Sequence, residues 1–256
     1  INEYTSNLLP LITSLLSVAL TFYIGKLFFG EKTGLLAAFL LSFYPVHVSY
    51  ATILFPDLPS AFFVALGVYI FLKAEKMKSK INYLISGVSI GVAYLMKELS
   101  VLIFSFFIIY IIYKKILKKE HFLVIFGFLI IFSFEMFYYM SQNLNPLFRY
   151  TSVESQAIDI IKTYYYNYFG MHIWSRLFLH YPYVLLMDIE ARYFYILYFI
   201  SILYFIINKK KETYPLLFWI IPIILYLKFG SNSFREYIPL VVGTRYLDFI
   251  TIPSII

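Results

Sequence analysis

Three charged residues, each beside a long apolar run, have side chains that could act in group transfer: Asp57, Lys97 and Arg245. A carboxylate can take or orient a proton. Lysine and arginine can neutralise a phosphate, and the planar guanidinium of arginine does so with two hydrogen bonds. Ionisable groups near membrane-spanning segments are costly and are functional candidates by default. Asp57 is therefore a candidate catalytic residue, and Lys97 and Arg245 are candidates for binding a phosphate.

Each candidate also has a simpler explanation. Asp57 precedes the apolar run that begins at Leu58, and aspartate is a favoured cap for the start of a helix. Lys97 and Glu98 could form an exposed ion pair at a turn, which contributes little to stability. Arg245 could extend from apolar surroundings to the lipid headgroups. Second-rank candidates for the same site lie close to these residues in the sequence: Glu98, Arg235 and Tyr246.

The composition indicates that these residues belong to a membrane protein. Hydrophobic residues make up 61% of the chain and charged residues 14%, whereas a soluble domain is nearer half apolar and a quarter charged. The net charge of +7 would suit nucleic acid, but the basic residues occur in short clusters between apolar runs, so we expect no nucleic-acid partner. The absence of cysteine excludes disulfides and thiolate metal sites.

Long apolar runs predict the elements that position the candidates. A spanning helix needs roughly 20 apolar residues, and lipid offers the backbone no other partners, so each run should be helical. Eight runs qualify: Leu8–Phe29, Gly34–Phe55, Leu58–Ala74, Ile81–Met96, Leu99–Tyr113, Phe122–Met140, Arg192–Ile207 and Tyr214–Phe229. A ninth begins near Thr244. We predict an all-α, polytopic transmembrane helical bundle with about eight full spans and a partial ninth. It forms a single transmembrane domain over residues 1–256, which we interpret as a fragment truncated at both ends.

Basic residues predict the orientation of this bundle. Most of the 21 lysines and arginines lie in alternate short connections, which are expected to be cytoplasmic. They include Lys26, Lys32, Lys73, Lys76, Lys78, Lys80, Lys114, Lys115, Lys118, Lys119, Lys209, Lys210 and Lys211. Topology alone is enough to explain these clusters. The opposite, outer side then holds Asp57, the turn at Lys97 and Glu98, residues 141–191 and the segment Gly230–Gly243.

The long external loop, residues 141–191, contains a second kind of helix signal. Apolar and aromatic residues recur there at helical spacing: Val153, Ala157, Ile158, Ile161, Tyr164, Tyr165 and Tyr168. Thr151 or Ser152 could cap the start of this helix. We predict an amphipathic helix over about 153–169 that lies in the outer membrane interface.

Other polar residues within the runs have structural explanations. Glu135 is a carboxylate within the sixth run, so it should be protonated or paired, and we expect an arginine or tyrosine partner. His47 is expected to be a core or interface histidine. Gly87 and Gly91 form a GxxxG pattern that is typical of close helix packing.

Five segments occur in the order and spacing of known motifs. The first is a loop with a helix start, residues 28–38. Two stretches, residues 44–50 and 55–63, lead through prolines to Asp57. The last two are a glycine-rich helix that ends at Lys97, residues 87–98, and a late Arg-Tyr pair, residues 243–247. Together they resemble the GT-C membrane glycosyltransferases, most closely the dolichyl-phosphate-mannose–protein mannosyltransferase type. The resemblance covers most of the chain, and residues 141–191 are the least similar part.

The resemblance implies a reaction and roles for the candidates. Members of this group transfer a sugar from a polyprenyl-phosphate carrier to an acceptor on the non-cytoplasmic side. Asp57 matches the family's second acidic position, Lys97 a basic position near the donor phosphate, and Arg245 a late phosphate-side position. The family's first acidic motif follows its first helix, and we expect that motif to lie upstream of residue 1. A divalent metal ion is compatible with the resemblance because some relatives with paired acids use one.

We therefore expect a glycosyltransferase of a prokaryotic cell membrane with its site on the outer face. The donor would be a polyprenyl-phosphate-linked sugar, and the acceptor a protein, lipid or glycan. One alternative is a transporter or flippase of lipid-linked glycans, which should show repeated halves and ionisable residues near the midplane. A second alternative is a non-catalytic membrane subunit that holds a partner.

Overall fold

The computed structural model describes residues 7–160, 200–204, 207, 211, 213–233, 237–238, 240 and 247–256. Helices dominate this part of the chain. Their bounds are α2 (Leu8–Phe29), α3 (Glu31–Ser42), α4 (Pro45–Ala51), α5 (Asp57–Met77), α6 (Lys80–Met96), η1 (Glu98–Leu102), α7 (Ile103–Lys114), η2 (Lys119–His121), α8 (Phe122–Ser141), α9 (Phe148–Ile160), α14 (Tyr214–Phe229) and α15 (Asp248–Ile255). The predicted helical membrane protein is confirmed at this level.

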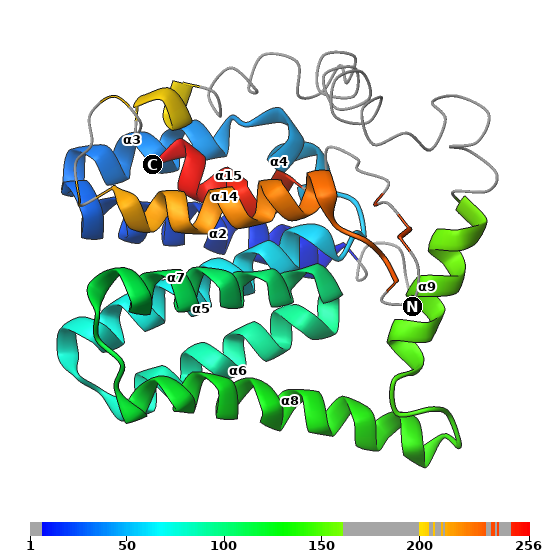
Figure 1. The fold of residues 1–256 in the computed structure, drawn as a ribbon. Helices are drawn as coiled ribbons and strands as arrows, with labels where there is room; N and C mark the ends of the chain where they lie inside the picture. Colours follow the sequence, from blue (N-terminus) through cyan, green and yellow to red (C-terminus); the bar gives the residue numbers. More distant parts are fainter. Residues whose placement is uncertain are drawn as a thin grey trace.

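The helices form a bundle in which neighbours along the chain also pack together (Figure 1). Helix α2 packs against α3 and α5, α5 packs against α6, and α6 packs against α8. From the later part of the chain, α14 lies beside α7, and α15 packs against α14, α5 and α3. Helix α5 is thus covered by several neighbours, and Asp57 at its start is buried among them.

The described residues do not confirm the eight membrane crossings that were expected. Three helices are long and apolar enough to cross a membrane, namely α2, α5 and the continuous η2–α8 segment. The bent pair α3–α4 would make a fourth if it counts as one span. Helices α6 and α14 are apolar but shorter, with 17 and 16 residues. Most of the predicted span Arg192–Ile207 lies outside the described residues.

The second predicted run, Gly34–Phe55, is not one straight helix. It is divided into α3 and α4, whose axes differ by 61°. Tyr44 has an extended backbone (φ −69°, ψ 114°) and is followed by Pro45 at the start of α4. Proline lacks a backbone N–H and disfavours helical geometry in the residue before it, which accounts for the break.

Glycines allow α6 and α8 to pack with their backbones close together. A Cβ atom added at Gly87 would lie 1.9 Å from the carbonyl oxygen of Val124, and one added at Gly127 would lie 2.3 Å from that of Leu84. Gly91 is similarly crowded by a side chain of α8. The prediction of close helix packing at Gly87 and Gly91 is confirmed.

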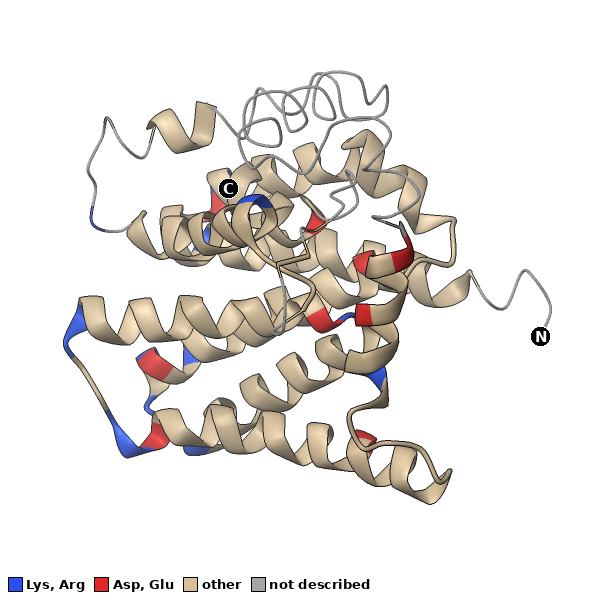
Figure 2. Cartoon of the chain, turned by 45° about the vertical axis from the view of Figure 1, so that its right-hand side comes forward, with Lys and Arg blue, Asp and Glu red and all other residues tan. Residues whose placement is uncertain are grey.

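Most lysines of the described residues gather at one end of the bundle, where Glu75 and Glu120 also lie. The lysine-rich connections that follow α5 and α7 lie at the same end (Figure 2). The start of α5 and the end of α6, with Asp57 and Lys97, lie at the other end. The structure thus groups the lysines as the alternating pattern requires, and their assignment to the cytoplasm stays a prediction.

Helix α9 leaves the end of α8 at a steep angle to the bundle (Figure 1). It begins at Phe148, so the expected start at Thr151 or Ser152 was wrong. The Thr151 hydroxyl instead donates to the carbonyl of Phe148 within the first turn, at 2.9 Å. The Ser233 hydroxyl, beyond α14, donates to Glu154 and attaches α9 to the bundle. Residues 161–169 of the predicted interfacial helix lie outside the described residues.

Candidate functional site

Asp57 and Lys97 form a buried ion pair at the end of the bundle opposite the lysine-rich connections. Asp57 is the first residue of α5, and Lys97 directly follows α6. The Lys97 ammonium donates a hydrogen bond to Asp57 Oδ1. The two residues are only 1% and 7% exposed. The structure therefore brings together two of the three residues that the sequence singled out.

Local geometry explains how the two helices present this pair. Helix α6 ends because Lys97 has an extended backbone (φ −152°, ψ 126°), although its N–H still bonds to the carbonyl of Ala93 at 2.9 Å. The Ser60 hydroxyl of α5 donates to the same carbonyl at 2.9 Å. Ser60 is one turn from Asp57, so this bond fixes the two helices beside the ion pair.

The simpler explanations of these residues do not hold. Asp57 lies one position inside α5, and the helix start has no side-chain capping bond, so the capping hypothesis was wrong. The exposed ion pair predicted at the turn was also wrong for Lys97, because Lys97 is buried and pairs with Asp57. Glu98 is exposed and begins η1, so the turn at Lys97 and Glu98 is confirmed.

Asp248 is a further acid in this region that the sequence analysis did not single out. It is the first residue of α15, is 5% exposed, and lies within electrostatic reach of both Asp57 and Lys97. Helix α15 packs directly against α5. The position of Asp248 inside the predicted ninth run was the available signal, since ionisable residues in such runs are functional candidates.

The two carboxylates have buried oxygen atoms that bond to nothing in the described structure. These atoms are Asp57 Oδ2 and Asp248 Oδ2. A buried acceptor without a donor is costly, and such atoms call for an explanation. Because these two oxygen atoms are acceptors without a donor, the site suits a ligand that donates hydrogen bonds, such as a hydroxyl or an amine.

A divalent metal ion does not fit the described residues. They contain no group of three or more histidine, cysteine, aspartate or glutamate side chains that could hold one. At this site the Lys97 ammonium also binds one of the two carboxylates. Acidic oxygen ligands without a competing cation are the usual partners of such ions.

The remaining predicted site residues cannot be placed from the structure. Arg235, Arg245 and Tyr246 lie outside the described residues. The described chain resumes at residue 247, directly before Asp248. Convergence of Arg245 with Asp57 and Lys97 therefore stays a prediction.

Two other buried ionisable residues have the structural partners that were expected. Arg149 donates from Nε to Glu135 at 2.6 Å and lies over the ring of Tyr94. Burial opposes the charge of Arg149, but the Glu135 carboxylate outweighs burial and raises the pKa of Arg149 above its ordinary value. His47 is buried and hydrogen-bonded to the Ser14 hydroxyl at 2.9 Å, which confirms a core histidine.

Comparison with known proteins identifies the family. The fold and the acid–lysine pair define a helical membrane protein with a buried polar site at one end. The family model described as dolichyl-phosphate-mannose-protein mannosyltransferase matches residues 2–138, just over half of the chain, and the chain belongs to this family. The expected GT-C glycosyltransferase resemblance is thereby confirmed. The matched segment includes Asp57 and Lys97. No curated protein and no solved structure matches the chain.

Proposed function

We propose that this chain transfers a sugar from a polyprenyl-phosphate-linked donor to an acceptor on the non-cytoplasmic face of a membrane. The observation that carries the proposal is the buried pair of Asp57 and Lys97, in which Asp57 Oδ2 has no hydrogen-bond donor among the described residues. The pair lies within the segment that matches the mannosyltransferase family. Its position opposite the lysine-rich connections supports an outer-face site.

The ion pair suggests how donor binding prepares the site. Without donor, the Lys97 ammonium binds Asp57. The phosphate of the donor offers Lys97 a second anionic partner, and a shift of Lys97 toward it leaves the Asp57 carboxylate available as a base. Asp57 then accepts the proton of the acceptor hydroxyl or amine as this group attacks the anomeric carbon. A single displacement of this kind inverts the anomeric centre.

Lys97 has a separate role in the departure of the lipid phosphate. The bond between the anomeric carbon and the phosphate oxygen breaks, and negative charge develops on the phosphate. A cation held in a buried site stabilises that charge more than it would in water. We propose that Arg245 contributes a second cation there, with Arg235, Glu98 and Tyr246 as second-rank members of the site.

The decisive experiment separates a catalytic role of Asp57 from a structural one. In the full-length protein, Asp57→Asn keeps the side-chain shape but removes the base, so transfer from a polyprenyl-phosphate sugar should fall by about 100-fold or more. Membrane insertion and the thermal midpoint report on folding. Full transfer activity in Asp57→Asn would refute the assignment.

A reversed pair provides the matched control. Removing one partner of a buried ion pair is destabilising by about 3–5 kcal/mol, because the other charge is left uncompensated. The double variant Asp57→Lys with Lys97→Asp restores opposite charges, so part of this stability should return. If the pair is catalytic, the protein with the reversed pair stays inactive, because its carboxylate then follows α6 instead of beginning α5. Recovery of transfer together with stability would assign the pair a structural role only.

A further inference from the structure

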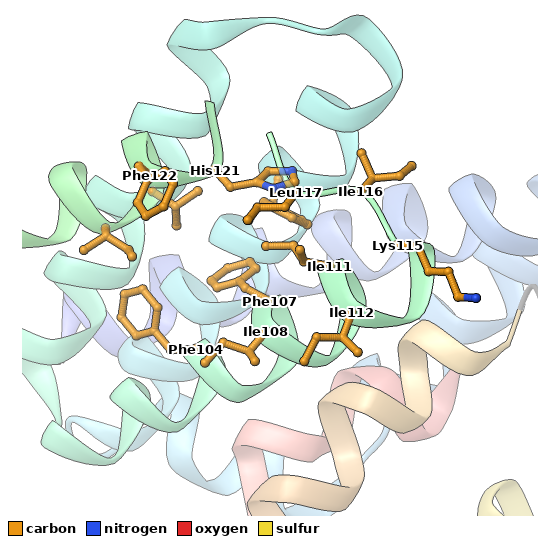
Figure 3. Close-up of a pocket in the computed structure, with 13 residues that line it drawn as sticks. Phe104, Phe107, Ile108, Ile111, Ile112, Lys115, Ile116, Leu117, His121 and Phe122 are labelled. Atoms are coloured by element: carbon orange, nitrogen blue, oxygen red, sulfur yellow. The ribbon is translucent and has the colours of Figure 1, made fainter. Parts of the chain in front are cut away.

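A cavity of about 460 Å³ lies between α5, α7 and α8, near the lysine-rich end of the bundle (Figure 3). Its inner wall is made of buried side chains, including Phe71, Phe107 and Val124. Its mouth is lined by exposed apolar side chains: Ile108, Ile112, Ile116, Leu117, Phe122 and Ile125. Because both the wall and the mouth are apolar, the cavity suits an apolar group that enters from lipid.

His121 is the polar side chain of the inner wall, and its ring nitrogens already have partners. Nδ1 accepts the backbone N–H of Lys118 at 3.2 Å, which places the ring proton on Nε2. Nε2 then donates to Glu75 Oε1 at 2.7 Å. His121 therefore offers no vacant hydrogen-bonding group to a ligand, and a polar ligand would lose its hydration without compensation.

Lysines lie in the connection at one side of the cavity mouth. Lys115 lines it directly, and Figure 3 shows the Lys115 amino group at the edge of the apolar side chains. Lys114, Lys118 and Lys119 belong to the same short connection. Lys118 is paired with Glu75 at 2.9 Å, and Glu120 adds one further acid nearby. Lys115 and Lys119 form no ion pair within the described residues, so this connection at the cavity rim carries excess positive charge.

We propose that this cavity binds one acyl chain of an anionic phospholipid whose phosphate contacts Lys115 and Lys119. Apolar walls select the chain, and the lysine rim selects a negatively charged headgroup. The headgroup end of the cavity lies where the lysine clusters place the cytoplasmic leaflet, which is the anionic leaflet of a cell membrane. The proposal does not depend on the sugar-transfer reaction.

The cavity is distinct from the proposed donor site. Asp57 begins α5 and Glu75 lies near its other end, and this 21-residue helix is about 30 Å long. A donor with its phosphate at Lys97 would present its headgroup at the opposite side of the membrane. The lysine rim requires a phosphate at its own end, which a membrane phospholipid supplies.

The test uses photoactivatable phosphatidylglycerol, with the reactive group on the acyl chain, in phosphatidylcholine vesicles that contain the full-length protein. Crosslinks should map to α7 and α8 between residues 104 and 125. Unlabelled phosphatidylglycerol should compete, and phosphatidylcholine should not. Equal competition by both lipids would overturn headgroup recognition. The absence of crosslinks between residues 104 and 125 would overturn the proposal that the cavity binds a lipid.

Matched variants give the proposal a second test. Ile125→Trp should fill the cavity and reduce crosslinking several-fold, whereas Leu129→Trp should not, since Leu129 lies one turn further along α8 and does not line it. Ile125 and Leu129 are 46% and 45% exposed, so both variants should fold alike.

A second pair of variants tests the headgroup contact. Lys115→Glu should also reduce crosslinking, in contrast to Lys78→Glu. Lys78 and Lys115 share a left-handed backbone (φ 54° in each) at the same end of the bundle. Equal effects within either pair of variants would contradict the proposal.

Discussion

Glu75 of α5 and His121 of η2 are joined by a hydrogen bond of 2.7 Å, although 46 positions separate them in the sequence. The same Glu75 carboxylate accepts a bond of 2.5 Å from the hydroxyl of Tyr83 and one of 2.9 Å from Lys118. One acid thus links α5 to α6 and to the connection before α8. In a low-dielectric environment, such a fully connected network favours a single arrangement of the helices.

Replacing Glu75 with glutamine should therefore destabilise the bundle. The substitution keeps the side-chain shape but removes the charge that three donors share, and we expect a loss of about 2 kcal/mol or more in the free energy of unfolding. Glu31→Gln is the matched control, because Glu31 forms an exposed pair with Lys26 at 3.5 Å. That exposed pair should contribute less than about 1 kcal/mol. Equal shifts of the thermal midpoint would show that the Glu75 network is not stabilising.

Gly87→Ala should also lower the free energy of unfolding, which is the opposite of the effect expected in an isolated helix. In a helix without close neighbours, replacing glycine with alanine stabilises by about 1 kcal/mol. Here the added methyl would lie 1.9 Å from the carbonyl oxygen of Val124, so α6 and α8 must separate. Overpacking of this kind costs roughly 1–3 kcal/mol. A raised thermal midpoint in Gly87→Ala would contradict the packing seen between these helices.

The bilayer constraint explains which parts of this fold could be predicted from the sequence. The run Leu8–Phe29 matches α2 at both ends, because lipid requires each long apolar run to close its own hydrogen bonds. Hydropathy does not record backbone breaks, so the bend between α3 and α4 was missed although Pro45 was visible. The start of α9 was misplaced because capping patterns depend on three-dimensional partners.

The site was predictable only in part, because the sequence does not show how the helices pack against one another. Residue type and position singled out Asp57 and Lys97, but their direct pairing depends on how α5 and α6 pack. Asp248 was missed although it lies inside the predicted ninth run, because the sequence does not show which helix that run packs against. Its significance emerges only when α15 is placed against α5.

Single-cysteine labelling tests the orientation of the bundle, and the natural chain contains no cysteine to interfere. Cysteines at exposed positions 98 and 155 should react with a membrane-impermeant maleimide in intact cells. Cysteines at exposed positions 78 and 119 should react only after the membrane is permeabilised. Labelling of position 78 in intact cells would show that the bundle has the opposite orientation, with the proposed site facing the cytoplasm.

Asp248→Asn tests whether the acid on α15 belongs to the sugar-transfer site. Asparagine has nearly the same shape, so helix packing should be preserved. Asp248 lies within electrostatic reach of Asp57 and Lys97, and its buried Oδ2 has no donor in the described structure. If it orients or deprotonates the acceptor, the substitution should slow the chemical step by about 100-fold in single-turnover experiments, with donor affinity little changed.

Thr251→Val is the control for this last substitution. Thr251 is buried one turn further along α15, and its hydroxyl donates to the carbonyl of Leu247 at 3.0 Å. Its replacement should lower the thermal midpoint slightly and leave the chemical step unchanged. If Asp248 only balances the charge of Lys97, Asp248→Asn should resemble Thr251→Val, with a changed midpoint and a normal single-turnover rate. That outcome would remove Asp248 from the site, while Asp57 and Lys97 would keep the roles proposed for them.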